Sequence, residues 1–219
     1  MNISKAIWRK LIRFYYSKLP LENVFYNKYY NPKFSWCKDN QGTTCVGSDD
    51  NTTKVLRSKL PYLIKKHKIK SIIDAGCGNF FWLRKLNLEK IDYFGIDIVK
   101  KIIEHNDKIY KKKNIKFLIA DLTKYAFPKA DLIICRDVLT RSSLKNNLFI
   151  INNIKNSESK YLLTTFFPST KKNYDIINGE FSRINLLLNP YNFRKPIFYI
   201  KEKDKLNKYI GLWKISEIN

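Results

Sequence analysis

Residues 71–78 read Ser-Ile-Ile-Asp-Ala-Gly-Cys-Gly, which we interpret as a buried strand that breaks into a glycine turn. The stretch carries one carboxylate, Asp74. Because Gly76 and Gly78 have no Cβ, the backbone can turn sharply there and come close to a ligand. A strand, a glycine turn and a helix in this order form a nucleotide-sized pocket at the end of a parallel strand. The sequence therefore predicts a small-molecule site directly after this strand.

A second apolar run, residues 93–98, contains the next candidate acid, Asp97. It follows Gly78 by 19 residues, close to the spacing of about 20 at which an acid meets a ribose in nucleotide-binding βαβ units. Both ribose hydroxyls can donate to one ionised carboxylate, and such charged hydrogen bonds are strong. The alternative is that Asp97 only caps a helix beginning near Val99, and the two roles are compatible.

Further strands and helices alternate along the chain, which predicts an α/β fold with a mainly parallel sheet. The expected strands are 115–121, 130–137 and 160–167, and the expected helices are 99–112 and 139–153. An acid stands at or near the C-terminal end of each of the first four strands, the side on which open α/β sheets bind ligands. These acids are Asp74, Asp97, Asp121 and Asp137.

Taken together, these motifs resemble the class I S-adenosylmethionine-dependent methyltransferases. The acid-glycine motif, the ribose acid at Asp97, the adenine-side pair Asp121-Leu122 and the fourth-strand motif at 135–139 occur in the family's order. A nicotinamide-binding Rossmann domain would need G-x-G-x-x-G, and no glycine follows Gly78 until Gly95. The resemblance implies a Rossmann-like methyltransferase fold, with a mainly parallel seven-stranded sheet whose last strand is antiparallel. It implies S-adenosylmethionine as the cofactor.

The second half of the chain adds to the resemblance. Residues 196–200 and 209–215 read as two strands joined by a charged turn, as at the antiparallel edge of the methyltransferase sheet. Residues between about 30 and 215 are similar to an uncharacterised bacterial subgroup of these enzymes. The chain departs from that pattern at Asn79, Phe80 and Arg141. We expect Asn79 to keep a polar group, and Phe80 an apolar lid, near the methionine part of the cofactor.

The resemblance implies a set of site residues. Asp137 is the candidate catalytic base or acceptor-positioning group, with binding of the methionine amino group or helix capping as alternatives. Arg136 and Arg141 could hold an anionic acceptor or the cofactor carboxylate, and Tyr191 and Asn192 are expected to line the acceptor pocket. No metal site is implied. The expected cofactor-binding residues are Asp74, Gly76, Gly78, Asn79, Asp97, Ile98, Asp121, Leu122 and Arg136.

Composition is consistent with one domain and an N-terminal extension: 219 residues, 44% of them apolar. We expect an amphipathic helical extension at 1–25, a covering loop with a lead-in helix at 26–68, and the methyltransferase domain at 69–219. No apolar run approaches the length of a membrane span, and no signal-peptide pattern is present. The four cysteines form no C-x-x-C pair, so structural zinc is not expected and a cytoplasmic location is predicted.

The formal charge of +23 invites a nucleic-acid interpretation, but Lys, Asn, Ile and Tyr are abundant throughout and the lysines are scattered. We therefore favour compositional bias over a selected nucleic-acid partner. Residues 6–16 are basic and aromatic, with apolar residues at helical spacing. A helix docked on the catalytic domain or covering its acceptor site is the favoured interpretation, and a helix lying on an anionic membrane is the alternative.

The predicted reaction is transfer of the sulfonium methyl to an oxygen or nitrogen nucleophile, in an acceptor that is a glycan or a small metabolite. The alternatives are a pseudoenzyme that binds S-adenosylmethionine and a basic protein that binds or methylates RNA.

Overall fold

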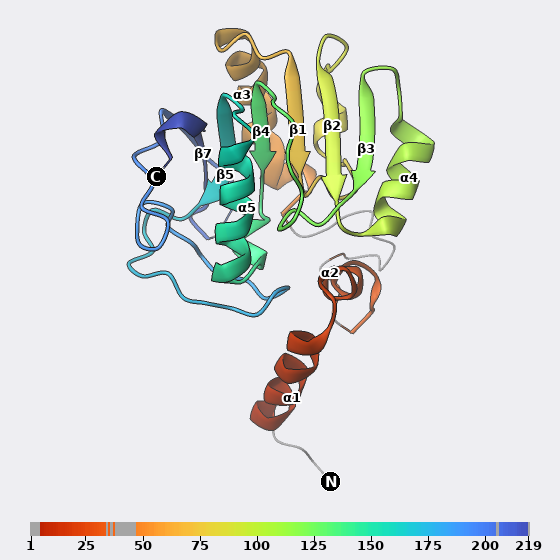
Figure 1. The fold of residues 1–219 in the computed structure, drawn as a ribbon, viewed down its shortest axis with the longest axis vertical. Helices are drawn as coiled ribbons and strands as arrows, with labels where there is room; N and C mark the ends of the chain where they lie inside the picture. The colour runs from red at the N-terminus through yellow and green to blue at the C-terminus, as the bar shows by residue number, and fades with distance from the viewer. Residues whose placement is uncertain (1–4, 34, 36, 38–46, 205, 219) are drawn as a thin grey trace.

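The structure is a computed structural model that describes residues 5–33, 35, 37, 47–204 and 206–218. Within these residues, seven strands form one sheet in the order β3-β2-β1-β4-β5-β7-β6 (Figure 1). The first five strands run parallel, whereas β7 is antiparallel to both of its neighbours. The strands are β1 (Ser71–Ala75), β2 (Asp92–Asp97), β3 (Ile115–Ile119), β4 (Leu132–Cys135), β5 (Tyr161–Phe166), β6 (Phe198–Lys201) and β7 (Tyr209–Lys214). The predicted fold class and the predicted hairpin at the sheet edge are confirmed.

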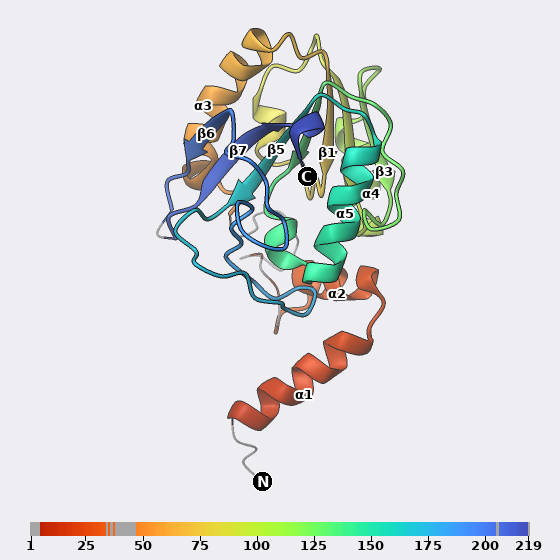
Figure 2. The ribbon, with the colours of Figure 1, turned by 60° about the vertical axis from the view of Figure 1, so that its left-hand side comes forward.

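Helices cover both faces of the sheet, as the short parallel strands require. The α-helices are α1 (Lys5–Lys18), α2 (Leu21–Tyr30), α3 (Asp50–Lys66), α4 (Lys100–Tyr110) and α5 (Leu144–Asn156), and the 3-10 turns are η1 (Leu83–Lys85), η2 (Leu139–Arg141) and η3 (Ile215–Glu217). α3 and α5 lie on opposite sides of the sheet (Figures 1 and 2).

The α3 face shows why its sequence forms a helix. Asp49 caps it by accepting hydrogen bonds from the backbone N–H groups of residues 51 and 52. Leu56, Leu60 and Leu63 recur at helical spacing, and all three are buried against the apolar side chains of the sheet.

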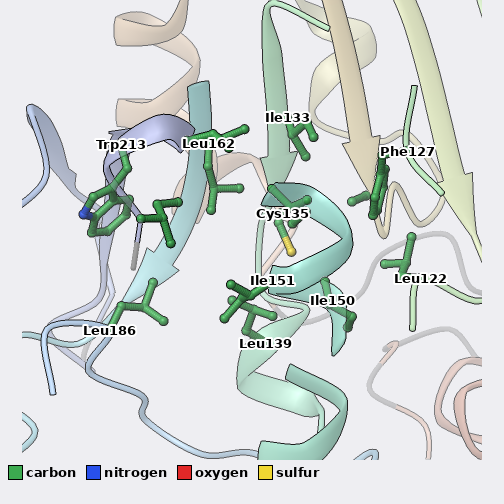
Figure 3. Packing of buried hydrophobic residues seen from close by; sticks show 14 of the residues in the cluster. Leu122, Phe127, Ile133, Cys135, Leu139, Ile150, Ile151, Leu162, Leu186 and Trp213 are labelled. Atoms are coloured by element: carbon green, nitrogen blue, oxygen red, sulfur yellow. The ribbon is translucent and has the colours of Figure 1, made fainter. Parts of the chain in front are cut away.

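The α5 face is the second half of the core (Figure 3). Ser143 caps α5, and Ile150, Ile151 and Ile154 pack on the sheet, where Cys135 is fully buried. Trp213 closes the same cluster from β7. This packing fixes where β4 ends, and therefore where the residues after it are presented.

The helix expected directly after the glycine turn is absent, and that expectation is wrong. Only the single 3-10 turn η1 lies between β1 and β2. Phe80 has a φ of +56°, a left-handed conformation that does not start a right-handed helix. Its ring is buried 4.6 Å from the ring of Tyr93 and 5.4 Å from that of Phe117, measured between centroids. Phe80 is thus a core residue rather than a lid over the cofactor.

The two N-terminal helices behave differently from each other. α2 lies across the carboxyl ends of the parallel strands, whereas α1 projects away from the domain (Figures 1 and 2). The favoured prediction for the first helix, docking on the domain or covering the site, is confirmed in part: Arg13 and Tyr16 in the second half of α1 contact the domain, but α1 does not lie across the strand ends as α2 does. The expected boundary at residue 25 falls inside α2. Part of the expected covering loop, residues 34, 36 and 38–46, lies outside the described residues.

None of the helices in the described part of the chain has the length and apolar character needed to cross a membrane. Cys77 and Cys135 are free and buried, whereas Cys37 is disulfide-bonded. A disulfide is more typical of an oxidising compartment than of a reducing one. The cytoplasmic location thus stays a prediction.

Candidate functional site

Asp97 is the anchor of the candidate site. Its two carboxylate oxygens accept hydrogen bonds from the backbone N–H of Gly78 and of Val99, both at 3.0 Å. The side chain is buried, and burial raises the pKa of its carboxyl, although the backbone N–H groups work in the opposite direction. Each oxygen keeps a lone pair for a further donor, so the carboxylate can still bind two hydroxyls.

The glycine turn fits closely between strands. The N–H of Gly76 donates to the carbonyl of Ile96 at 2.8 Å, which ties the turn to the end of β2. Gly76 has a φ of +82°, and a Cβ there would lie 2.2 Å from Cγ2 of Val138. No other residue fits this position without moving the backbone.

Asp74 lies beneath the turn rather than in a cavity. Its Oδ2 accepts a hydrogen bond from the Tyr93 hydroxyl at 2.9 Å, and only 3% of the residue is exposed. Burial raises the pKa of Asp74 to about 7. The structure therefore places it outside the set that lines the site, because its side chain points into the core below the turn, where it supports the strands.

The first cavity, of about 620 Å³, lies at the ends of β1, β2, β3 and β4. It brings together residues predicted from separate motifs: Gly76, Asp97, Ile98, Asp121 and Leu122 all line it. The Asp121 carboxylate is held by the hydroxyl of Thr123 at 2.7 Å. Polar oxygens and apolar side chains thus alternate along a wall that fits a nucleoside.

The second cavity, of about 610 Å³, lies on the other side of the glycine turn. Gly78, Asn79 and Arg136 line it, as does Ser48 from the segment before α3. Gly76, Tyr29, Asp137 and Arg141 line both cavities and so stand where the two meet. The two cavities form one site that follows the strand ends.

Sequence reasoning missed the contribution of α2. Leu21, Phe25 and Tyr29 all line the first cavity. Their four-residue spacing places them on one face of the helix, and this spacing was the signal available in the sequence. A Cβ on Gly78 would lie 3.0 Å from the Tyr29 hydroxyl. α2 is thus the wall that faces the glycine turn.

Four charged residues form a buried network behind the second cavity. Arg136 donates to Glu202 through Nε at 3.0 Å and through Nη2 at 2.8 Å. Lys208 Nζ lies 2.7 Å from Glu202 Oε2 and 3.0 Å from Asp137 Oδ2. Neither Glu202 nor Lys208 was expected at the site from the sequence. The network joins the end of β4 to the β6–β7 hairpin.

Within this network, Asp137 is held as an anion. Burial would raise the pKa of its carboxyl, but the charges of Arg136 and Lys208 outweigh burial and hold the pKa far below its usual range. The Thr165 hydroxyl donates to the same carboxylate at 3.1 Å. A carboxylate this stabilised is a poor general base, so of its predicted roles the geometry favours positioning.

Tyr191 and Asn192 do not reach the site. Tyr191 is 3% exposed, and its hydroxyl accepts a hydrogen bond from Asn147 of α5 at 2.8 Å. Asn192 is exposed, with its backbone N–H bonded to the carbonyl of Leu188 in a turn. Neither lines the two cavities, because this turn packs Tyr191 into the α5 core. The expectation that they line the acceptor pocket is corrected accordingly.

A sheet of this order, with cavities at the carboxyl ends of its parallel strands, defines an α/β protein that binds a nucleotide-like ligand. Comparison with known proteins specifies the class. The family model described as a methyltransferase domain matches residues 66–182, just over half of the chain. The chain belongs to this methyltransferase family, and it is an S-adenosylmethionine-dependent methyltransferase.

Solved structures share the fold at low sequence identity. Magnesium protoporphyrin IX methyltransferase (ChlM) from Synechocystis PCC 6803 with bound SAH aligns at a TM-score of 0.57 and 15% identity, covering 94% of this chain and 98% of that one. PH0226 protein from Pyrococcus horikoshii OT3 aligns at 0.56 and 15%, covering 92% and 98%. PKMT2 from Rickettsia typhi aligns with 21% identity and a TM-score of 0.40. The alignment covers 46% of this chain but only 21% of PKMT2. No curated protein matches the sequence.

The residues present fit S-adenosylmethionine. A buried carboxylate with free lone pairs faces the first cavity at Asp97, as a ribose requires. Ile98 and Leu122 supply apolar surface for the adenine, and Gly76 lets the ligand approach the backbone. The geometry of the site therefore fits the cofactor that methyltransferases of this class use.

Proposed function

We propose that this enzyme transfers the methyl group to an ionised oxygen, most simply a carboxylate, of a small metabolite or an acidic glycan. The observation that carries the proposal is that Arg141 and a strongly stabilised Asp137 both line the two cavities where they meet. This narrows the broader expectation of an oxygen or nitrogen nucleophile.

The cofactor site in this proposal uses the strand-end residues. Asp97 binds the ribose hydroxyls, Ile98 and Leu122 contact the adenine, and Asp121 lies at its edge. Gly76, Gly78 and Asn79 border the path of the methionine part toward the second cavity. When bound, S-adenosylmethionine supplies a methyl group on a positively charged sulfur, which is a good leaving group.

The acid–base properties of the second cavity support an acceptor that is already ionised. The low pKa of Asp137 makes it a weak proton acceptor. Burial raises the pKa of Tyr29, and the charge of Asp97 adds to that effect, so its phenol stays protonated at neutral pH. A carboxylate nucleophile needs no proton removed, whereas a sugar hydroxyl would need a base that these two residues do not provide.

Arg141 is the proposed binding group for the acceptor. It extends from the 3-10 turn η2 and lines both cavities. Burial lowers the pKa of its guanidinium, although Asp137 works in the opposite direction, and an arginine stays charged at any pH of interest. Arg136 donates to Glu202 and pairs with Asp137 in the network behind the second cavity. The role of the enzyme is then to orient the nucleophile in line with the methyl group.

Asp137 positions rather than deprotonates in this scheme. Asp137 lines both cavities where they meet, so its negative charge can orient the methionine amino group or the acceptor there.

The first experiment is calorimetry of the purified protein with S-adenosylmethionine, with NAD and ATP as controls. Selective binding establishes the cofactor site. Methyl transfer from labelled cofactor is then measured to sugar acids and small carboxylic acids, each beside its neutral analogue. A product that releases methanol in mild base identifies a methyl ester.

The Arg141→Gln variant tests the acceptor site separately. We expect KM for the acidic acceptor to rise at least about tenfold, as for the loss of one charged hydrogen bond, with a smaller change in cofactor affinity. Arg183→Gln, which removes an exposed arginine, is the matched control. Equal transfer to neutral analogues would contradict the proposed acceptor class while leaving the cofactor site intact.

A further inference from the structure

Two described side chains of α1, Arg13 and Tyr16, contact the rest of the molecule. Tyr16 is 4% exposed, and the Lys28 ammonium of α2 lies 4.6 Å above its ring. Arg13, one turn earlier, pairs with Glu180 at 3.1 Å. These two residues share a side of the helix, which is therefore the side that faces the domain.

The opposite face is apolar and in contact with solvent. Leu11, Phe14 and Tyr15 are 50%, 65% and 55% exposed. Leu11 and Phe14 lie roughly 160° around the helix from Arg13 and Tyr16, at 3.6 residues per turn. The helix projects from the domain, so no other described element approaches this face (Figures 1 and 2). An apolar face of this kind needs a partner outside the domain.

The charges on α1 identify the kind of partner. The helix sequence contains five basic residues and no acid: Lys5, Arg9, Lys10, Arg13 and Lys18. The Lys18 ammonium lies 5.6 Å from the ring centre of Phe14, so the C-terminal end of the apolar face carries a cation. A second copy of this helix would bring like charges together, which disfavours self-association through α1. An anionic surface with an apolar interior complements both features.

We propose that α1 lies on an anionic lipid surface, with Leu11 and Phe14 inserted among the acyl chains and the lysines at the headgroups. Aromatic and aliphatic residues on one face, with cations beside them, are the features of helices that bind in the plane of a membrane interface. Each cation near such a surface adds to the attraction, which falls as salt rises. The formal charge of +23 acts in the same direction.

Sedimentation of the full chain with lipid vesicles tests this proposal. The vesicles are phosphatidylcholine with and without phosphatidylglycerol, at low and high salt. We expect binding only to the anionic vesicles, and weaker binding at high salt. The double variant Leu11→Ser with Phe14→Ser should bind at least about tenfold more weakly, because two apolar side chains no longer enter the bilayer. Lys10→Gln with Lys18→Gln should lose about fivefold per charge.

The matched control removes the same two residue types elsewhere. Leu148 and Phe149 on α5 are 43% and 47% exposed, and Leu148→Ser with Phe149→Ser should leave vesicle binding unchanged. Circular dichroism and thermal unfolding of each variant show that the fold is retained. Vesicle binding that does not depend on Leu11 and Phe14 would overturn the proposal, since it would reflect charge alone. So would a dimer, seen by light scattering, that the α1 double variant dissolves.

Discussion

Asp97 ends β2 and Asp137 follows β4, so both lie at the carboxyl ends of the parallel strands. The protein nevertheless shifts the pKa values of the two carboxylates in opposite directions. Asp97 is held by backbone N–H groups, and burial leaves its pKa raised. Asp137 is only partly buried, and the charges of Arg136 and Lys208 more than offset that burial and lower its pKa. Backbone dipoles orient a carboxylate and leave its charge available to a ligand. A carboxylate paired with two cations stays ionised and is held in a fixed position.

The largest expected loss of stability comes from Glu202, whose side chain is fully buried between Arg136 and Lys208. Glu202→Gln leaves Arg136 and Lys208 with too little negative charge, and we expect it to lower the free energy of unfolding by about 3–5 kcal/mol. Urea denaturation measures this loss. Glu217→Gln, which removes an exposed ion pair with Lys214, should leave the free energy almost unchanged. Equal effects of the two variants would show that the buried network carries no special weight.

The Asp97→Asn variant should affect cofactor binding more than stability. A neutral amide cannot accept both ribose hydroxyls, so affinity for S-adenosylmethionine should fall by about ten- to a hundredfold. The free energy of unfolding should change by only about 1 kcal/mol, from one backbone N–H left without an acceptor. Calorimetry and urea denaturation give the two values, and Asp92→Asn at the exposed start of β2 is the control. Unchanged affinity would remove Asp97 from the ribose role.

Asp74 adds a dependence on pH, because burial raises its pKa and its carboxylate accepts a hydrogen bond from the uncharged Tyr93. The native state then binds a proton more tightly than the unfolded chain does. The contribution of Asp74 to stability is therefore full below pH 3.8 and is lost as pH rises toward about 7. Relative to Asp74→Asn, the wild-type free energy of unfolding should fall by about 1.4 kcal/mol per pH unit at the steepest point.

Denaturation of both proteins across this pH range measures the difference. Tyr93→Phe sharpens the test, because the Tyr93 hydroxyl lowers the pKa of Asp74 and its removal should move the decline to higher pH. A wild-type curve parallel to that of Asp74→Asn would show that Asp74 titrates alike in both states.

The smallest expected effect concerns Thr165, the uncharged side chain that forms hydrogen bonds with Asp137. Thr165 accepts from the Asp137 backbone N–H at 2.9 Å and donates to its carboxylate. Thr165→Val keeps the shape of the side chain and should lower the free energy of unfolding by about 1 kcal/mol. Urea denaturation is again the measurement. A loss as large as that of Glu202→Gln would mean that the hydroxyl, and not the cations, sets the state of Asp137.

The sequence predicted those parts of the site that depend on residues close together in the chain. The glycine turn and the acids at strand ends depend on short patterns within one βα unit, and Gly76, Asp97, Asp121 and Leu122, which these patterns single out, line the first cavity. The partners of Arg136 and Asp137 are not local. Glu202 and Lys208 stand 66 and 71 residues further along the chain and arrive only because the last two strands pair antiparallel.

Other differences have a packing origin. The pattern after Gly78 gave no sign that Phe80 would adopt a left-handed conformation and enter the core, which shortens the expected helix to one 3-10 turn. Tyr191 follows a turn that resembles an acceptor motif, but its hydroxyl is bonded within the core. Whether an aromatic side chain faces a cavity or a core depends on neighbouring helices, which a single sequence does not place.

Residues 29 and 78 share one volume of space, since a β-carbon at Gly78 would meet the Tyr29 hydroxyl. A change at one position therefore alters the space available at the other. Homologues that keep a tyrosine at position 29 should keep glycine at 78, and those with a larger residue at 78 should carry a smaller one at 29. The history of the glycine motif is in this way linked to that of a helix far upstream, which motif searches treat as a separate region.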